Sequence, residues 1–139
     1  MTVPVRGLGP GTLFHMLIAQ RPVLRYIGGM PVAASQKVSA LAEDFGSLRR
    51  LADALGVDPA QVSRWARGGG IDAKNAARLD LLELAVSAVA RLYEPEVMED
   101  WLFGLNPALA DRRPIDVIRA GDLPAVLCAI RAEEGESFA

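Results

Sequence analysis

Side chains that can bind nucleic acid are concentrated between positions 48 and 67. Arg64 can make a bidentate pair of hydrogen bonds to the edge of a guanine, and Gln61 or Ser63 can donate to or accept from bases and phosphates. A basic side chain nearby, Lys74, is of the kind that contacts phosphate oxygens. The candidate DNA contacts in this region are Arg49, Arg50, Pro59, Ala60, Gln61, Ser63, Arg64 and Arg67.

Reactive residue types elsewhere in the chain do not combine into a catalytic or metal site. His15 has no Cys or His nearby to share a metal, and Cys128 falls where a small core residue is expected. Glu133 and Glu134 are adjacent, so on a helix they point apart and cannot act as an acid–base pair. The glycines at 68–70 lack the lysine and the preceding strand of a phosphate loop. We expect a binding protein, not an enzyme, with no cofactor and no metal.

The segment from Leu48 to Arg67 has the pattern of a helix-turn-helix. Two short helices can cross closely only where the crossing residue is small and the turn accepts a positive φ. Ala52 is that small residue, and Gly56 follows it four positions later. The apolar residues expected between the two helices are Leu51, Leu55, Val57, Val62 and Trp65. Because the second helix of such a motif enters the major groove, the pattern predicts DNA binding; the alternative is a scaffold whose arginines form an ordinary solvated face.

Helix start and stop signals punctuate the chain from Ser35 onward, and no alternation typical of a strand appears. Ser47, Asp58 and Asp72 are of the type that caps a helix N-terminus, and Gly46 is of the type that ends one. The predicted helices cover residues 35–45, 47–55, 58–67, 72–93, 95–104, 114–120 and 122 to about 134–135. The sequence therefore predicts an all-α fold, in which a helix-turn-helix N-terminal bundle is followed by a small helical domain.

The basic and acidic residues are distributed unevenly along the chain. Residues 1–47 hold four basic and two acidic groups, residues 48–78 hold six and three, and residues 79–139 hold five and twelve. The balances of +2, +3 and −7 agree with the net charge of −2. A basic first half and an acidic second half indicate two surfaces with different partners. We divide the chain into an extension of poorly defined structure at 1–34, a helix-turn-helix domain with a long linking helix at 35–93, and a second domain at 94–139.

The composition predicts a cytoplasmic protein. The single cysteine excludes an internal disulfide and is typical of a reducing compartment. No apolar run reaches the roughly 18 residues that a membrane span requires, and the first residues lack the apolar stretch of a secretory signal. We expect no membrane partner.

The C-terminal half resembles the toxin-binding domain of the Xre/MbcA/ParS antitoxins. A tryptophan closes a helix, an Asn-Pro turn and a leucine follow, and an Arg-Pro-Ile-Asp segment starts the next helix. The matching positions are Trp101, Asn106, Pro107, Leu109, Arg113 to Asp116, Gly121 and the glycine at the end of the final helix, Gly135. Together with the helix-turn-helix, the resemblance covers roughly residues 35–139.

The resemblance implies the antitoxin of a type II toxin–antitoxin system. Its N-terminal helices would bind operator DNA and repress its own operon, and its C-terminal end would block the active site of a RES-domain toxin that consumes NAD. An acidic tail with a terminal aromatic suits a basic cleft that binds a dinucleotide. The expected toxin-binding residues are Glu133, Glu134, Gly135, Glu136, Ser137, Phe138 and Ala139. A stand-alone helix-turn-helix transcriptional regulator is the alternative interpretation.

A homodimer is also expected, within a hetero-oligomer of toxin and antitoxin. A single helix-turn-helix covers only a short half-site, so specific binding needs a two-fold pair. The long helix at 72–93 carries more apolar residues than one face can hold. We interpret this surplus as a subunit interface.

Overall fold

The computed structural model describes residues 26–27, 30–31 and 33–137, and the side chains of 33–135. Seven α-helices and one short 3-10 helix make up most of the described part: α2 (Ala34–Phe45), α3 (Leu48–Leu55), α4 (Pro59–Ala66), α5 (Ala73–Ala90), α6 (Pro95–Phe103), η2 (Pro107–Leu109), α7 (Pro114–Arg119) and α8 (Leu123–Ser137). Two strands of two residues each, β1 (Tyr26–Ile27) and β2 (Met30–Pro31), pair antiparallel. The predicted all-α fold is confirmed, with this minimal hairpin added.

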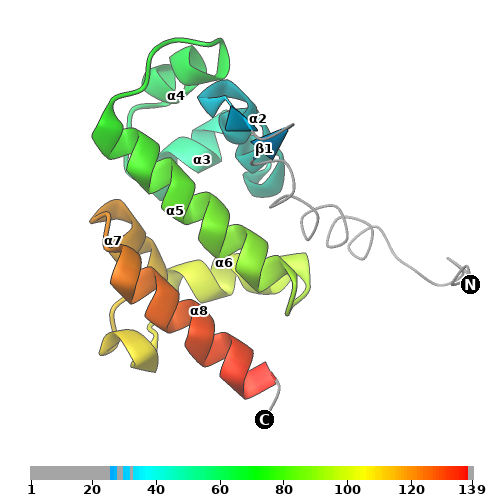
Figure 1. Ribbon diagram of the computed structural model, residues 1–139, viewed down its shortest axis with the longest axis vertical. Coiled ribbons are helices and arrows are strands. Elements are labelled where there is room, and N and C mark those ends of the chain that lie inside the picture. Colours follow the sequence, from blue (N-terminus) through cyan, green and yellow to red (C-terminus); the bar gives the residue numbers. More distant parts are fainter. Residues whose placement is uncertain (1–25, 28–29, 32, 138–139) are drawn as a thin grey trace, which may run out of the picture.

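Helix α5 runs through the middle of the molecule (Figure 1), with α2, α3 and α4 at one end and α6, α7 and α8 at the other. It ends at Ala90, earlier than the predicted Tyr93, because the next residues form a turn. It is buried around most of its circumference, at Leu79, Leu81, Leu82, Glu83, Ala85, Val86, Ser87, Ala88, Val89 and Ala90. The surplus of apolar residues on this helix is therefore used inside the chain's own core, which runs without a break from Val38 to Ile130.

Local sequence chemistry fixes the starts of the helices as expected. The side chain of Ser47 accepts a hydrogen bond from the Arg50 N–H, and those of Asp58 and Asp72 cap α4 and α5 in the same way. Hydrogen bonds from Asn75 hold the pKa of the Asp72 carboxyl below its ordinary value. The N-cap predictions are confirmed.

The final helix differs from the prediction in two respects. Gly135 does not end it, since α8 continues to Ser137. A glycine ends a helix when it adopts a left-handed conformation, as Gly121 does at φ +74, and Gly135 is not among the glycines with positive φ. Cys128 is exposed and not part of the core, because the buried face of α8 is formed by Val126, Ala129 and Ile130 and residue 128 lies on the opposite side.

Candidate nucleic-acid interface and the acidic C-terminal end

Helices α3 and α4 form the predicted helix-turn-helix. Gly56 lies in the left-handed region at φ +71, and the N–H of Val57 donates to the carbonyl of Ala52 at 3.0 Å. Val62 and Trp65 of α4 are almost completely buried against the bundle. The turn therefore presents one face of α4 to solvent.

That exposed face of α4 carries the residues predicted to contact DNA. Its N-cap, Asp58, accepts from the N–H of Ala60 at 2.8 Å, so the helix starts firmly at Pro59. Pro59, Ala60, Arg64 and Arg67 are exposed, and Gln61 and Ser63 are half-buried. The structure brings these six residues together on one short helix and its C-cap, where a partner can reach them.

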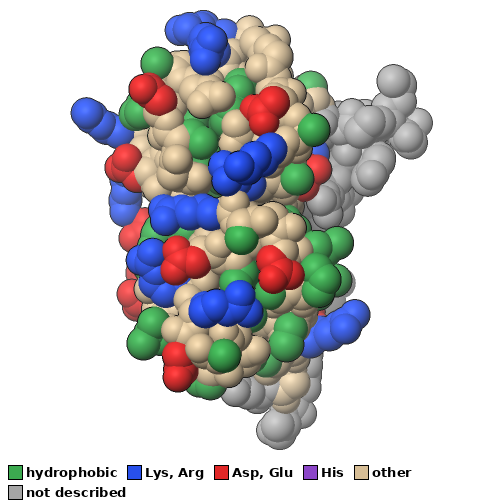
Figure 2. Space-filling view, turned by 90° about the vertical axis from the view of Figure 1, so that its left-hand side faces the viewer, with side chains coloured by type: hydrophobic (Ala, Val, Ile, Leu, Met, Phe, Trp, Pro, Cys, Tyr) green, Lys and Arg blue, Asp and Glu red, His purple; other side chains and the backbone are tan. Residues whose placement is uncertain are grey.

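The predicted phosphate contacts differ in their availability. Arg49 and Lys74 are exposed, and among the described residues neither forms an ion pair. Arg50, in contrast, places its guanidinium 2.5 Å from the Glu99 carboxylate of α6. The face in Figure 2 carries both signs of charge, with Lys and Arg side chains at the end where Figure 1 places α4. Arg50 therefore reaches a phosphate only if its pair with Glu99 opens.

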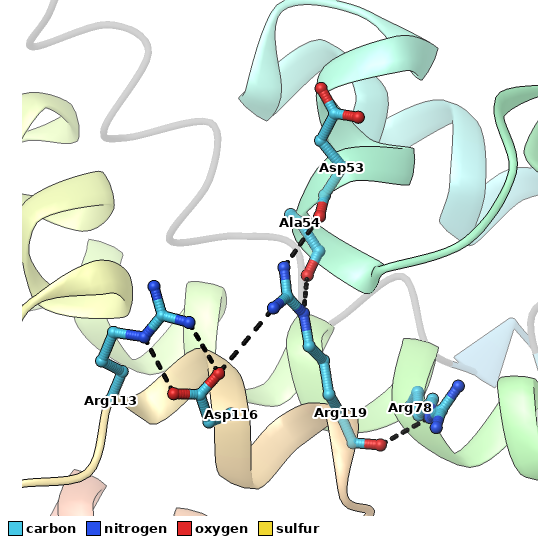
Figure 3. Close-up of polar contacts among 6 residues, drawn as sticks. All are labelled: Asp53, Ala54, Arg78, Arg113, Asp116 and Arg119. Carbon is cyan, nitrogen blue, oxygen red and sulfur yellow. Dashed lines mark hydrogen bonds and ion pairs between the residues drawn. The ribbon is translucent and has the colours of Figure 1, made fainter.

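An arginine that the sequence did not single out connects the two ends of the molecule (Figure 3). Arg119, at the end of α7, donates from Nε to the carbonyl of Ala54 and from Nη2 to the carbonyl of Asp53, both at 2.8 Å. Its own carbonyl accepts from Nε of Arg78 on α5 at 2.6 Å. Its only signal in the sequence is its place three residues after Asp116, in the segment that starts with Arg113.

The same helix holds a second arginine in a local pair. Arg113 donates from Nε and Nη2 to the two carboxylate oxygens of Asp116 at 2.8 and 2.9 Å. These hydrogen bonds hold the pKa of Asp116 below its ordinary value, against the opposing effect of partial burial, and raise the pKa of Arg113. This pair joins the N-cap residue of α7 to its first turn.

Glu133 connects the acidic C-terminal end to the turn that follows α5. Its carboxylate accepts a hydrogen bond from the Tyr93 hydroxyl at 2.6 Å, and Glu134 lies 4.0 Å from the Arg91 guanidinium. Gly135 is exposed, and Glu136 and Ser137 continue the helical backbone. The last two predicted toxin-binding residues, Phe138 and Ala139, lie outside the described residues.

Other kinds of site find little support in the described part of the chain. Over residues 33–135, no three His, Cys, Asp or Glu side chains lie close enough to hold a metal ion, and His15 lies outside the described residues. None of the described helices is long and apolar enough to cross a membrane.

Comparison with known proteins identifies relatives of this arrangement. No protein-family model matches the chain. The mycobacterial cidal antitoxin MbcA of Mycobacterium tuberculosis is 31% identical over 106 residues, which cover 75% of this chain and 93% of that protein, and MbcA of Mycobacterium bovis matches with the same values. A chain of the crystal structure of the M. tuberculosis MbcT–MbcA toxin–antitoxin complex superposes with a TM-score of 0.61 at 28% identity, over 76% of this chain and 96% of that one.

The likeness extends over both halves of the molecule, because 106 matched residues exceed the length of either. The matched residues therefore include parts of both the helix-turn-helix and the C-terminal half of this chain. An antitoxin is favoured over a stand-alone regulator. The chain belongs to the MbcA family, whose members are antitoxins of toxin–antitoxin systems.

Proposed function

We propose that this antitoxin inhibits a RES-domain, NAD-consuming toxin by covering its active-site cleft, and represses its own operon through the helix-turn-helix. The observation that carries the proposal is the likeness, over 76% of this chain, to a chain from a complex of antitoxin and toxin. The protein would act by binding alone, in the cytoplasm. Its partners would be the toxin, operator DNA and a second copy of itself.

The toxin-facing residues in this proposal are 133–139, as expected from the sequence. A cleft that binds the phosphates of a dinucleotide is basic, so the negative charge of residues 79–139 favours its approach. Helix α8 holds the backbone as far as Ser137 in one conformation, and the contact from Tyr93 orients Glu133. Such preorganisation lowers the entropy that is lost when the end of the chain enters a cleft.

The DNA-facing residues in the proposal are those on the exposed face of α4, supported by Arg49 and Lys74. Arg64 would read a guanine edge, and Arg67 would contact the backbone. Two copies of the chain would present two such helices to an operator with two half-sites. The apolar residues of α5 no longer argue for the dimer, since they are buried within one chain, so the dimer rests on this requirement of the operator.

The decisive experiment separates the two ends of the molecule by co-expression with the toxin encoded beside this gene. A chain that lacks residues 136–139 keeps the contact between Tyr93 and Glu133 and should keep its fold and its DNA binding. We expect this truncated chain to lose protection, with arrested growth and a fall in cellular NAD. The matched variant Arg64→Ala should protect fully while losing operator binding.

Three results would contradict the proposal. If the neighbouring gene encodes no RES-domain toxin, the partner is wrong. If the truncated chain protects as well as the full chain, the last four residues do not block the cleft. If Arg64→Ala abolishes protection, the toxin contacts the half of the molecule that we assign to DNA.

A further inference from the structure

Side-chain contacts with α6 and α7 connect both ends of helix α3 to the C-terminal half of the molecule. Near its start, Arg50 pairs with Glu99 of α6 at 2.5 Å. At its end, Arg119 of α7 binds two of its carbonyls. Between these ties lies a groove of about 170 Å³, lined by Phe45, Arg50, Asp53, Ala54, Glu99 and Phe103. The groove leaves α3 with few contacts to α6 apart from the tie at its start.

Arg119 adds to the C-terminal cap of α3, whose own segment already supplies the N–H groups of Gly56 and Val57. The last carbonyls of a helix have no partner within it, and a buried carbonyl without a partner is destabilising. Ala54 is only 1% exposed, and the hydrogen bond to its carbonyl comes from Arg119 of another helix. The C-terminal end of α3 therefore combines donors from its own segment with a guanidinium from a distant helix.

Gly56 lies beside the Arg119 guanidinium, at van der Waals distance for a Cβ, and its positive φ is what favours glycine there. A Cβ placed on Gly56 would lie 3.4 Å from Nε of Arg119 and 3.7 Å from its Cδ. The turn between α3 and α4 therefore packs directly on the guanidinium group. The glycine of the turn and Arg119 thus lie side by side, although 63 positions separate them in the sequence.

Two side chains, one on α5 and one on α7, hold Arg119 itself in position. Arg78 of α5 donates to its carbonyl at 2.6 Å, and Asp116 of α7 lies 3.8 Å from its guanidinium. Helix α7 packs in turn against α8, which carries the acidic end (Figure 1). A physical path thus runs from α8 through α7 and Arg119 to the end of α3 and the start of α4.

From this geometry we infer that Arg119 is a positioning residue for the DNA-binding surface: it fixes the turn at Gly56 and ties the orientation of α4 to the unit that carries the acidic end. The DNA part of this inference rests on the proposed function, whereas the structural part does not. Removal of Arg119 should loosen the turn without touching any residue that faces DNA.

The test compares Arg119→Ala with Arg113→Ala in the full-length chain. Both variants remove one arginine that partners Asp116, but among the described residues Arg113 has no hydrogen bond or ion pair to α3. Amide hydrogen exchange of the free protein is the first measurement. In Arg119→Ala, exchange at residues 54–58 should be about tenfold faster or more, with the amides of α5 changed much less. In Arg113→Ala, these rates should change by less than about twofold.

A conservative variant keeps the test valid if Arg119→Ala fails to fold. Arg119→Lys keeps the charge but has one ammonium for two carbonyls, so exchange at 54–58 should lie between the wild type and Arg119→Ala. If amide hydrogen exchange becomes equally faster in α3 and in α5 of these variants, Arg119 has a merely structural role and the inference is overturned. Unchanged exchange at residues 54–58 would overturn it as well.

The second measurement is affinity for an arbitrary-sequence DNA duplex at low salt. Arg119→Ala should bind it several-fold more weakly than Arg113→Ala, although both lose the same charge. Equal affinities would show that the turn does not position α4 through Arg119. If the wild-type chain binds no duplex, the DNA half of the proposed function fails, and hydrogen exchange alone decides the structural part.

Discussion

The salt dependence of DNA binding provides the sharpest test of which cations contact phosphate. Among the described residues, Arg49, Arg64, Arg67 and Lys74 are exposed near the helix-turn-helix and form no ion pair, whereas Arg50 is paired with Glu99. On a duplex of arbitrary sequence, which lacks the operator guanine assigned to Arg64, we predict that all four contact phosphate, so that replacing any one of them by alanine flattens the salt dependence. Replacing Arg50 should leave it unchanged.

The magnitude follows from counterion release. Each phosphate neutralised on duplex DNA contributes about −0.9 to the slope of log affinity against log salt, so four contacts give about −3.6 per chain. Between about 50 and about 200 mM salt, that slope weakens binding about 150-fold. With three contacts the slope is about −2.7 and the weakening about 40-fold.

Fluorescence anisotropy with an arbitrary-sequence duplex at several salt concentrations measures these slopes. Arg49→Ala and Arg50→Ala form the matched pair, since the two residues are adjacent and differ in the partner at Glu99. Equal flattening by both variants would mean that the Arg50–Glu99 pair opens on DNA, and the reasoning from the free structure would fail. Unchanged slopes in all five variants would show that this face does not bind DNA.

Three further predictions concern stability. Leu82→Ala, at a fully buried site of α5, should lower the free energy of unfolding by about 2–5 kcal/mol in urea titrations, with a single transition seen by probes in both halves. Asp58→Ala should cost about 1 kcal/mol and Asp58→Asn much less, because asparagine can still accept from the Ala60 N–H; equal losses would argue against the cap. The lowered pKa of Asp116 means that its pair with Arg113 is fully stabilising above the ordinary carboxyl pKa and is lost as pH falls through the lowered one. Asp116→Asn should therefore be less stable than the wild type in urea at neutral pH and equally stable in strong acid.

The features that the sequence predicts well depend on neighbouring residues. Ser47 and Asp58 cap helices through backbone groups two or three positions away, and Gly56 adopts the left-handed conformation that its turn requires. Such short-range chemistry is visible in the sequence itself. The helix-turn-helix and most helix boundaries were predicted for this reason.

The features that the sequence missed depend on contacts between distant residues. Nothing near Arg50 indicates that Glu99, 49 positions later, occupies its guanidinium, and nothing near Ala54 indicates that Arg119 caps its carbonyl. The exposure of Cys128 depends on which side of α8 the rest of the molecule covers. Only the folded arrangement decides these points, because a partner can come from any element that packs nearby.

The central position of α5 has a consequence for the turnover of the protein. This helix contributes buried residues to the packing of both ends of the molecule, so neither end retains a complete core when the other opens. A protease that cuts the opened chain at either end would therefore remove the DNA surface and the acidic C-terminal end together. Under the proposed function, a single cleavage would then end both repression and inhibition of the toxin, with no long-lived fragment that retains only one of the two activities.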